Sequence, residues 1–211
     1  MRSLILFVSC LLPVIARAEV IDRVAVSLGN SVIAESEVLR QIRIAALLNG
    51  VEPDFSAASK RETAERLVEQ ELIRREIALS QYMPNSVQKS DALYKIFRKR
   101  FPSEQDYQQA LKKDQLTDAE IRAAFEWQAT FLDFVDIRFR PGIQVPEEEM
   151  RRYYEEEIKP KNTPDATVSY EEARPKIEEI LTQKLVDNAL DRWLGQSRTQ
   201  TRIRYRREAL Q

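Results

Sequence analysis

The sequence predicts a mainly α protein with a small β element: a multi-helix core whose N-terminal β-hairpin is joined by a C-terminal strand. Three observations support this fold class. Apolar residues recur with helical spacing over most of residues 36–200. Short alternating segments flank this helical region, at Val20–Ile33 and Thr201–Arg207. Because an isolated two-stranded hairpin is only marginally stable, we expect these two segments to meet in one sheet.

The first half of the chain carries clear turn and helix-end signals. Gly29-Asn30 separates two apolar runs and predicts the hairpin turn. Ser36 is the expected N-cap of the first helix, which Asn49-Gly50 ends. The second helix covers about Lys60–Tyr82 and stops at Pro84. A third helix is expected at about Val87–Lys99, with Leu93, Ile96 and Phe97 as core candidates, and a fourth after Ser103.

The helix predicted at about Asp118–Asp136 is unusual because it carries two apolar stripes. Thr117 and Glu120 form a capping box at its start. One stripe consists of Ile121, Ala124, Phe125, Leu132 and Val135, and the second of Trp127, Phe131 and Phe134. A one-sided surface helix needs a single stripe. The second stripe is therefore either additional core or an exposed apolar binding surface. Core packing is the commoner role of aromatic residues at helical spacing.

The last third of the chain predicts two helices and two short strands. Residues 136–141, DIRFRP, alternate briefly like a strand, and Pro146 begins a helix that ends at Pro160. Ser169 and Glu172 form a second capping box, but Pro175 favours a helix start, so Tyr170–Arg174 is expected to be a separate turn. The segment RIRYRR, residues 202–207, is interpreted as an edge strand with arginines on its solvent-exposed face rather than as a basic patch that binds nucleic acid.

Composition excludes several kinds of chemistry. The chain has no His and one Cys, Cys10, and contains no P-loop, GxGxxG or HExxH motif. A His-based catalytic triad, a His metal ligand and a His proton shuttle are therefore excluded. The 33 basic and 34 acidic residues nearly balance, which argues against a nucleic-acid partner. No cofactor or metal is expected.

The N-terminus predicts a secretory signal peptide over residues 1–18. Arg2 is followed by the apolar run Leu4–Ile15, and the ARA sequence at residues 16–18 predicts cleavage after Ala18. The run is shorter than the roughly 20 residues that span a bilayer, although a short membrane anchor is the alternative. Cleavage would remove the only Cys, so that the exported chain would depend on its packed core and not on disulfides.

The ordered set of segments resembles the SurA-like periplasmic chaperones. VIDRVAVSLGNSVIAESEVLRQI resembles their opening hairpin and first helix, and RLVEQELIRREIAL resembles their second helix. The stretch from Phe101 to Glu156 is similar to their later core, and VSYEEARPKIEEILTQKLVDNALDRWL to their C-terminal return helix. The family usually carries a parvulin-type prolyl isomerase domain between the last two. Here that interval is a short linker, residues 159–168, between an N-terminal helical region, residues 19–158, and a C-terminal helix and strand, residues 169–211.

The resemblance implies an ATP-independent periplasmic holdase and not an enzyme. Such a chaperone would bind unfolded envelope or outer-membrane proteins through an apolar groove, without a nucleic-acid partner and without membrane insertion. A dedicated assembly factor for one envelope protein is the alternative, and a homodimer is left open. The candidate client-binding residues are Trp127, Phe131, Phe134, Tyr153 and Tyr154, for which core packing between the two lobes is the competing interpretation.

Overall fold

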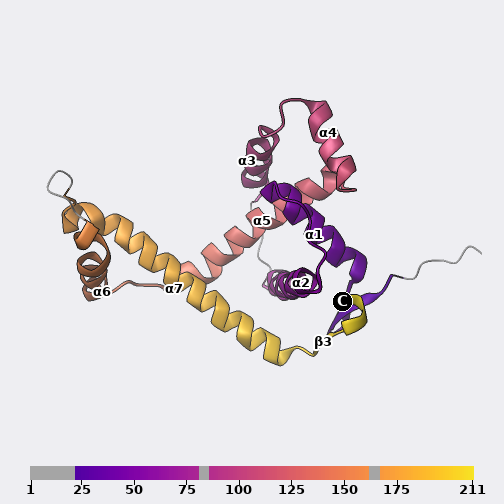
Figure 1. Ribbon diagram of the computed structural model, residues 1–211. Helices are drawn as coiled ribbons and strands as arrows, with labels where there is room; N and C mark the ends of the chain where they lie inside the picture. Colours follow the sequence, from indigo (N-terminus) through magenta and orange to yellow (C-terminus); the bar gives the residue numbers. More distant parts are fainter. Residues whose placement is uncertain (1–21, 81–85, 162–166) are drawn as a thin grey trace, which may run out of the picture.

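The computed structural model describes residues 22–80, 86–161 and 167–211. Within these ranges it contains seven α-helices and one three-stranded antiparallel sheet, which confirms the predicted fold class (Figure 1). The signal peptide, its cleavage point after Ala18, the stop at Pro84 and residues 162–166 of the linker lie outside the described residues. Among the described residues, none of the helices is both long and apolar enough to cross a membrane.

The sheet joins the two ends of the described chain, as predicted. Strands β1 (Val24–Leu28) and β2 (Ser31–Ala34) form the hairpin, and Gly29 has a φ of 55° in its turn. Strand β3 (Ile203–Tyr205) pairs antiparallel with β1, which gives the order β2-β1-β3. Val26, Leu28 and Ile33 are buried on the face that packs against helices.

Helices α1 (Glu35–Asn49) and α2 (Ala57–Leu79) cover that face. Gly50 closes α1 in the left-handed conformation, with a φ of 69°. The expected N-cap was wrong, because α1 begins two residues earlier than Ser36 would allow, with Ala34 as N-cap. Ser36 lies in the first turn, and the Asp22 carboxylate accepts its backbone N–H at 3.2 Å. An acidic side chain from outside the helix thus satisfies an N–H group that a capping serine would otherwise bond.

Helices α3 (Val87–Arg98), α4 (Glu104–Lys113) and α5 (Asp118–Phe139) form a second lobe with α1. The Thr117–Glu120 capping box is present. The strand predicted at 136–141 was wrong: α5 continues through it to Phe139, and a short 3₁₀ turn, η1 (Arg140–Gly142), follows. Four alternating residues are a weak signal, and Phe139 packs edge-on against Phe134 one and a half turns earlier, at 5.8 Å between ring centroids.

Helix α6 (Glu147–Tyr153) starts after Pro146, as predicted, and continues into a π-turn, η2 (Tyr154–Ile158), and a 3₁₀ turn, η3 (Lys159–Lys161). Helix α7 (Tyr170–Gln200) has 31 residues and is therefore roughly 46 Å long. The separate turn expected at Tyr170–Arg174 was wrong, because the helix runs continuously through Pro175. The Ser169–Glu172 capping box fixes its start, so that the one N–H missing at proline is tolerated near the helix end.

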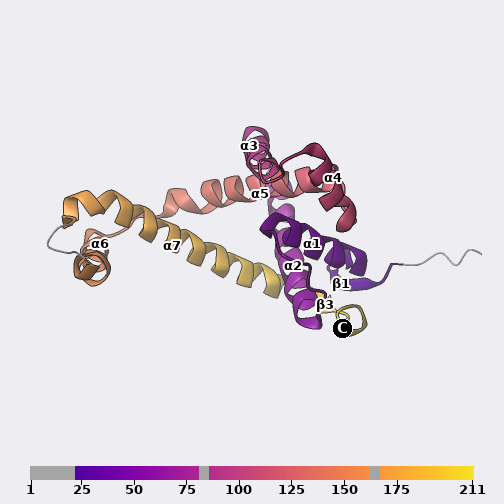
Figure 2. The ribbon, with the colours of Figure 1, turned by 45° about the horizontal axis from the view of Figure 1, so that its top comes forward.

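Helix α7 connects two distant parts of the molecule. Its first half packs against α6 through Met150, Ala173, Ile177 and Leu181, and forms a projecting two-helix arm. Its second half returns to α2 and α5. Figure 2 shows the arm at one end of the molecule and the sheet with α1 and α2 at the other. After β3, the 3₁₀ turn η4 (Arg207–Ala209) brings buried Ala209 and Leu210 into the core beneath the sheet.

Candidate functional site

Three adjoining surface clefts follow helix α5 and together form the α5 groove. The first lies between α2, α5 and α7, the second between α1, α2 and α5, and the third between α1, α3 and α5. Their volumes are about 310, 390 and 390 Å³. Trp127 lines both the first and the second cleft, and Gln41, Leu48 and Gln128 line both the second and the third. The clefts therefore adjoin one another along the helix.

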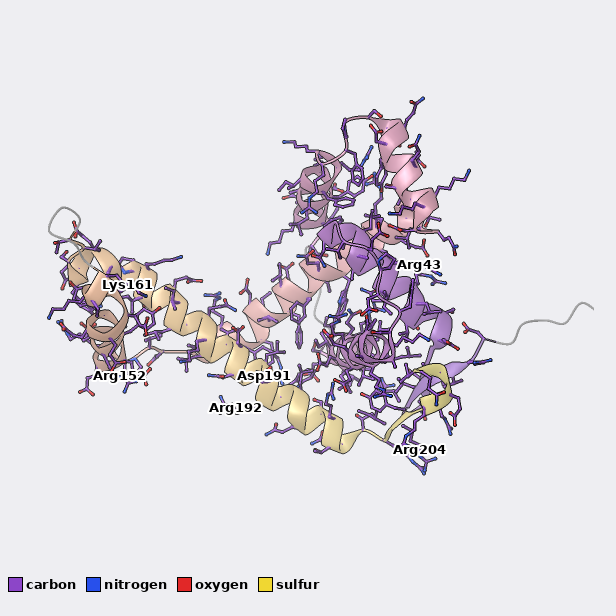
Figure 3. All side chains as sticks on the ribbon, viewed as in Figure 1. Arg43, Arg152, Lys161, Asp191, Arg192 and Arg204 are labelled. Carbon is purple, nitrogen blue, oxygen red and sulfur yellow. The ribbon has the colours of Figure 1, made fainter. Side chains whose placement is uncertain are left out.

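The first cleft has a mainly apolar lining with charged residues at its rim. Trp127 and Phe131 of α5 are both half-buried, and their rings lie 6.5 Å apart. The helices on either side add further apolar side chains to the walls, namely Ile73, Leu190 and Leu194. Asp191 stands at the rim and forms no ion pair with another described residue (Figure 3). The cleft is large enough to hold one large side chain of a bound chain.

The middle cleft differs from the first because charged side chains border it. The guanidinium of Arg74 lies 4.6 Å from the centre of the Trp127 ring, a cation–π contact that holds one face of the indole. Arg40 of α1 and Glu120 of α5, which both line the cleft, form an ion pair at 3.0 Å. These contacts fix the walls between α1, α2 and α5, so that the middle of the groove is pre-formed.

The third cleft exposes an apolar side chain above an aromatic floor. Ile96 of α3 is 61% exposed at its edge, whereas Phe97 and Phe125 are buried beneath it, with ring centroids 5.5 Å apart. Leu48 and Leu93 are partly buried and complete the apolar walls. An exposed isoleucine in a concave apolar surface favours contact with a partner's side chain.

A network of hydroxyl, carboxylate and guanidinium groups fixes the floor of the third cleft. Asp118 accepts hydrogen bonds from the hydroxyls of Tyr94 and Tyr107, the latter at 2.7 Å, and from Nε of Arg122 at 2.7 Å. Burial raises the pKa of Asp118, but the bonds from Tyr107, Tyr94 and Arg122 outweigh it and lower the pKa to about 2. Burial, together with the Asp118 bond, raises the pKa of Tyr107. The network ties α3, α4 and the start of α5 together.

Three glutamine side chains line the groove. Gln41 and Gln128 border the second and third clefts, and Gln70 borders the first and second. Among the residues that the structure describes, none hydrogen-bonds to any of these three amides. A free carboxamide offers N–H donors and one carbonyl acceptor, which are the complementary partners of the C=O and N–H groups of a peptide backbone. The groove can therefore bond to the main chain of a bound segment whatever its side chains are.

The structure brings only two of the five predicted site residues into this groove. Trp127 and Phe131 line it, whereas Phe134 is 3% exposed and lies in the core between α5 and α7. Phe134 is therefore a core residue, as in the competing interpretation, and does not line the groove. The first predicted stripe also differs from expectation, because Leu132 is 47% exposed. The continued helix turns Phe134 toward α7 and Leu132 toward solvent.

Tyr153 and Tyr154 lie in the arm, in a separate apolar cluster from that of Trp127 and Phe131. The Tyr154 hydroxyl donates to the Val168 carbonyl at 2.8 Å, and its ring packs edge-on against Tyr170 at 5.6 Å. Both tyrosines therefore hold the end of α6 against the start of α7. They do not line the α5 groove.

No strong sequence signal marks the other groove residues. Ile96 was predicted to be core because it shares an apolar run with Leu93 and Phe97, but α3 turns it outward. The three glutamines stand on polar helix faces, where glutamine is common, so only their convergence in space distinguishes them.

The described residues contain no group of three or more His, Cys, Asp or Glu side chains that could hold a metal ion. Comparison with known proteins finds no protein-family model and no curated protein that matches the chain.

Proposed function

We propose that the protein is an ATP-independent holdase of the periplasm, which binds unfolded envelope or outer-membrane proteins in the α5 groove. The observation that carries the proposal is the row of three adjoining clefts along α5, with apolar walls at both ends of the row and three glutamine amides that bond to no described residue. The resemblance to SurA-like chaperones and the predicted signal peptide support the same class and compartment.

A holdase must bind many sequences and release them again. The apolar walls supply affinity that scales with the area buried, about 25 cal/mol per Å². The amides supply main-chain hydrogen bonds that do not depend on sequence. Trp127 and Ile96 remain partly exposed in the free protein, so that a client side chain displaces water from them without unfolding the groove.

The proposal assigns no chemistry to the groove. The chain lacks His, and the short linker at 159–168 stands where the SurA-like chaperones, which the sequence resembles, usually carry an isomerase domain. The proposed activity is therefore the shielding of extended chains, and no residue is assigned a catalytic role.

The test compares two isoleucines that differ mainly in position. Ile96 is 61% exposed in the third cleft, and Ile137 is 57% exposed on α5 but outside the three clefts. We expect Ile96→Ser to weaken suppression of aggregation of a diluted, denatured outer-membrane protein, and Ile137→Ser to leave it unchanged. Both variants should melt close to the wild type, because neither side chain is buried.

Two results would count against this function. Equal suppression by both variants would remove the third cleft from the client site. If the wild-type protein fails to suppress aggregation of several unrelated clients, and a pull-down from an envelope extract recovers one stoichiometric protein, the alternative of a dedicated assembly factor would replace the holdase.

A further inference from the structure

Strand β3 leaves one edge of the sheet open. The N–H of Gly29 donates to the Arg202 carbonyl at 3.0 Å, and the N–H of Arg206 donates to the Ala25 carbonyl at 2.8 Å. In an antiparallel pair the main-chain groups of alternate residues point to the same side. Those of Ile203 and Tyr205 therefore point away from β1, and no hydrogen bond from another described residue reaches them.

The same strand carries a row of unpaired positive charges. Arg202, Arg204 and Arg206 alternate along it and are exposed, and Arg207 follows directly. Within the described part of the chain, none of their four guanidinium groups forms an ion pair or a hydrogen bond. Arg204 lies opposite Ser27 in the register and extends away from the helices (Figure 3). This side of the strand is therefore an uncompensated basic surface.

The other side of β3 borders a hollow of about 520 Å³. Tyr205, which is 40% exposed, stands beside it together with Arg61 and Glu65 of α2 and the buried Leu210. Ile203 and Tyr205 point to this side because their partners in β1, Leu28 and Val26, face the core. A fourth strand placed along β3 would project every second side chain toward this hollow.

We propose that β3 accepts an extended segment of a partner polypeptide as a fourth strand, and that this segment alternates acidic residues with apolar or aromatic ones. Its main chain would pair with Ile203 and Tyr205, its carboxylates would face Arg202, Arg204 and Arg206, and an aromatic side chain would enter the hollow beside Tyr205. An anionic membrane would use the arginines but neither the free main-chain groups nor the hollow, so a polypeptide fits better. The site is separate from the α5 groove and does not depend on the proposed holdase activity.

The decisive test uses the wild-type protein and three fluorescent ten-residue peptides in which Glu alternates with Val and Tyr. One peptide is unmodified, and the other two carry N-methyl groups on the odd or on the even residues. Because a strand at a sheet edge bonds through alternate residues only, we expect one methylated peptide to lose at least tenfold in affinity and the other to bind nearly as well as the parent. Fluorescence anisotropy measures the affinities.

Charge substitution supplies an independent test. Arg204→Glu together with Arg206→Glu replaces two attractions by two repulsions, so the variant should bind the acidic peptide roughly tenfold more weakly. The same variant should gain affinity for a peptide in which Lys replaces Glu. Arg152→Glu makes half of this charge change on an exposed arginine of the arm, far from β3, and should change neither affinity (Figure 3).

Three outcomes would overturn the proposal. The first is that the unmodified peptide does not bind, and the second is that both methylated peptides bind equally well. The third is that the protein binds vesicles of anionic phospholipid and the peptide does not compete with them. The first outcome leaves the holdase assay unaffected, so that failure of this site and failure of the proposed function remain distinguishable.

Discussion

The burial of Phe134 allows a quantitative prediction for the second aromatic stripe. Phe134 is 3% exposed and packs against Phe139 and Trp193, at 5.8 and 5.7 Å between ring centroids. Removing such a ring from a core costs ~3–5 kcal/mol. In a chain of this size each kcal/mol lowers the melting temperature by ~2–4 °C, so Phe134→Ala should melt about 6–20 °C lower.

Phe131 is the matched control, because it is the same residue type on the same helix but only half-buried in the open first cleft. Its truncation removes a partly exposed ring and leaves no sealed cavity, so Phe131→Ala should cost ~1–2 kcal/mol, less than Phe134→Ala. Thermal unfolding followed by circular dichroism measures both variants. If Phe134→Ala melts within 2 °C of the wild type, Phe134 is not packed in a core between α5 and α7.

Two further predictions concern acid stability and catalysis. The pKa of Asp118 falls on folding from 3.8 to about 2, so its stabilising contribution is fully present above pH 4 and is lost as the pH drops toward 2. Asp118→Asn should therefore lower the melting temperature at pH 7, and a gap that does not narrow at pH 2 would contradict this assignment. The purified protein should not accelerate cis/trans exchange of an X-Pro peptide, an uncatalysed process of tens to hundreds of seconds, and a rate increase proportional to protein concentration would contradict it.

Much of the fold could be predicted from local signals. The capping boxes at Thr117 and Ser169 and the left-handed Gly50 each satisfy backbone groups at a helix end, so they are visible in the sequence and recur in the structure. The pairing of β3 with the hairpin followed from the instability of two strands alone. Errors arose where tertiary packing overrode a short local pattern, as at residues 136–141, where Phe139 continues the helix to reach Trp193.

The groove was harder to predict than the fold. Periodicity showed that α5 has two apolar stripes. Which residues of these stripes are buried depends on where α7 crosses α5. That crossing buries Phe134 and leaves Phe131 and Trp127 at the border. A sequence pattern contains no information on the crossing point of two helices whose contacting residues, Phe134 and Trp193, lie far apart in the chain, and so could not separate these residues.

The course of α7 explains why the two ends of the α5 groove differ. At the first cleft α7 supplies Leu190 and Leu194 as walls, and its Trp193 packs against Phe134 directly behind them. This end cannot widen without breaking a buried aromatic contact. At the third cleft the exposed wall is Ile96 of α3, which stands above the buried rings of Phe97 and Phe125. In the proposed holdase, a bound chain would therefore meet an apolar cleft walled by α7 at one end of the groove and an exposed isoleucine above an aromatic floor at the other.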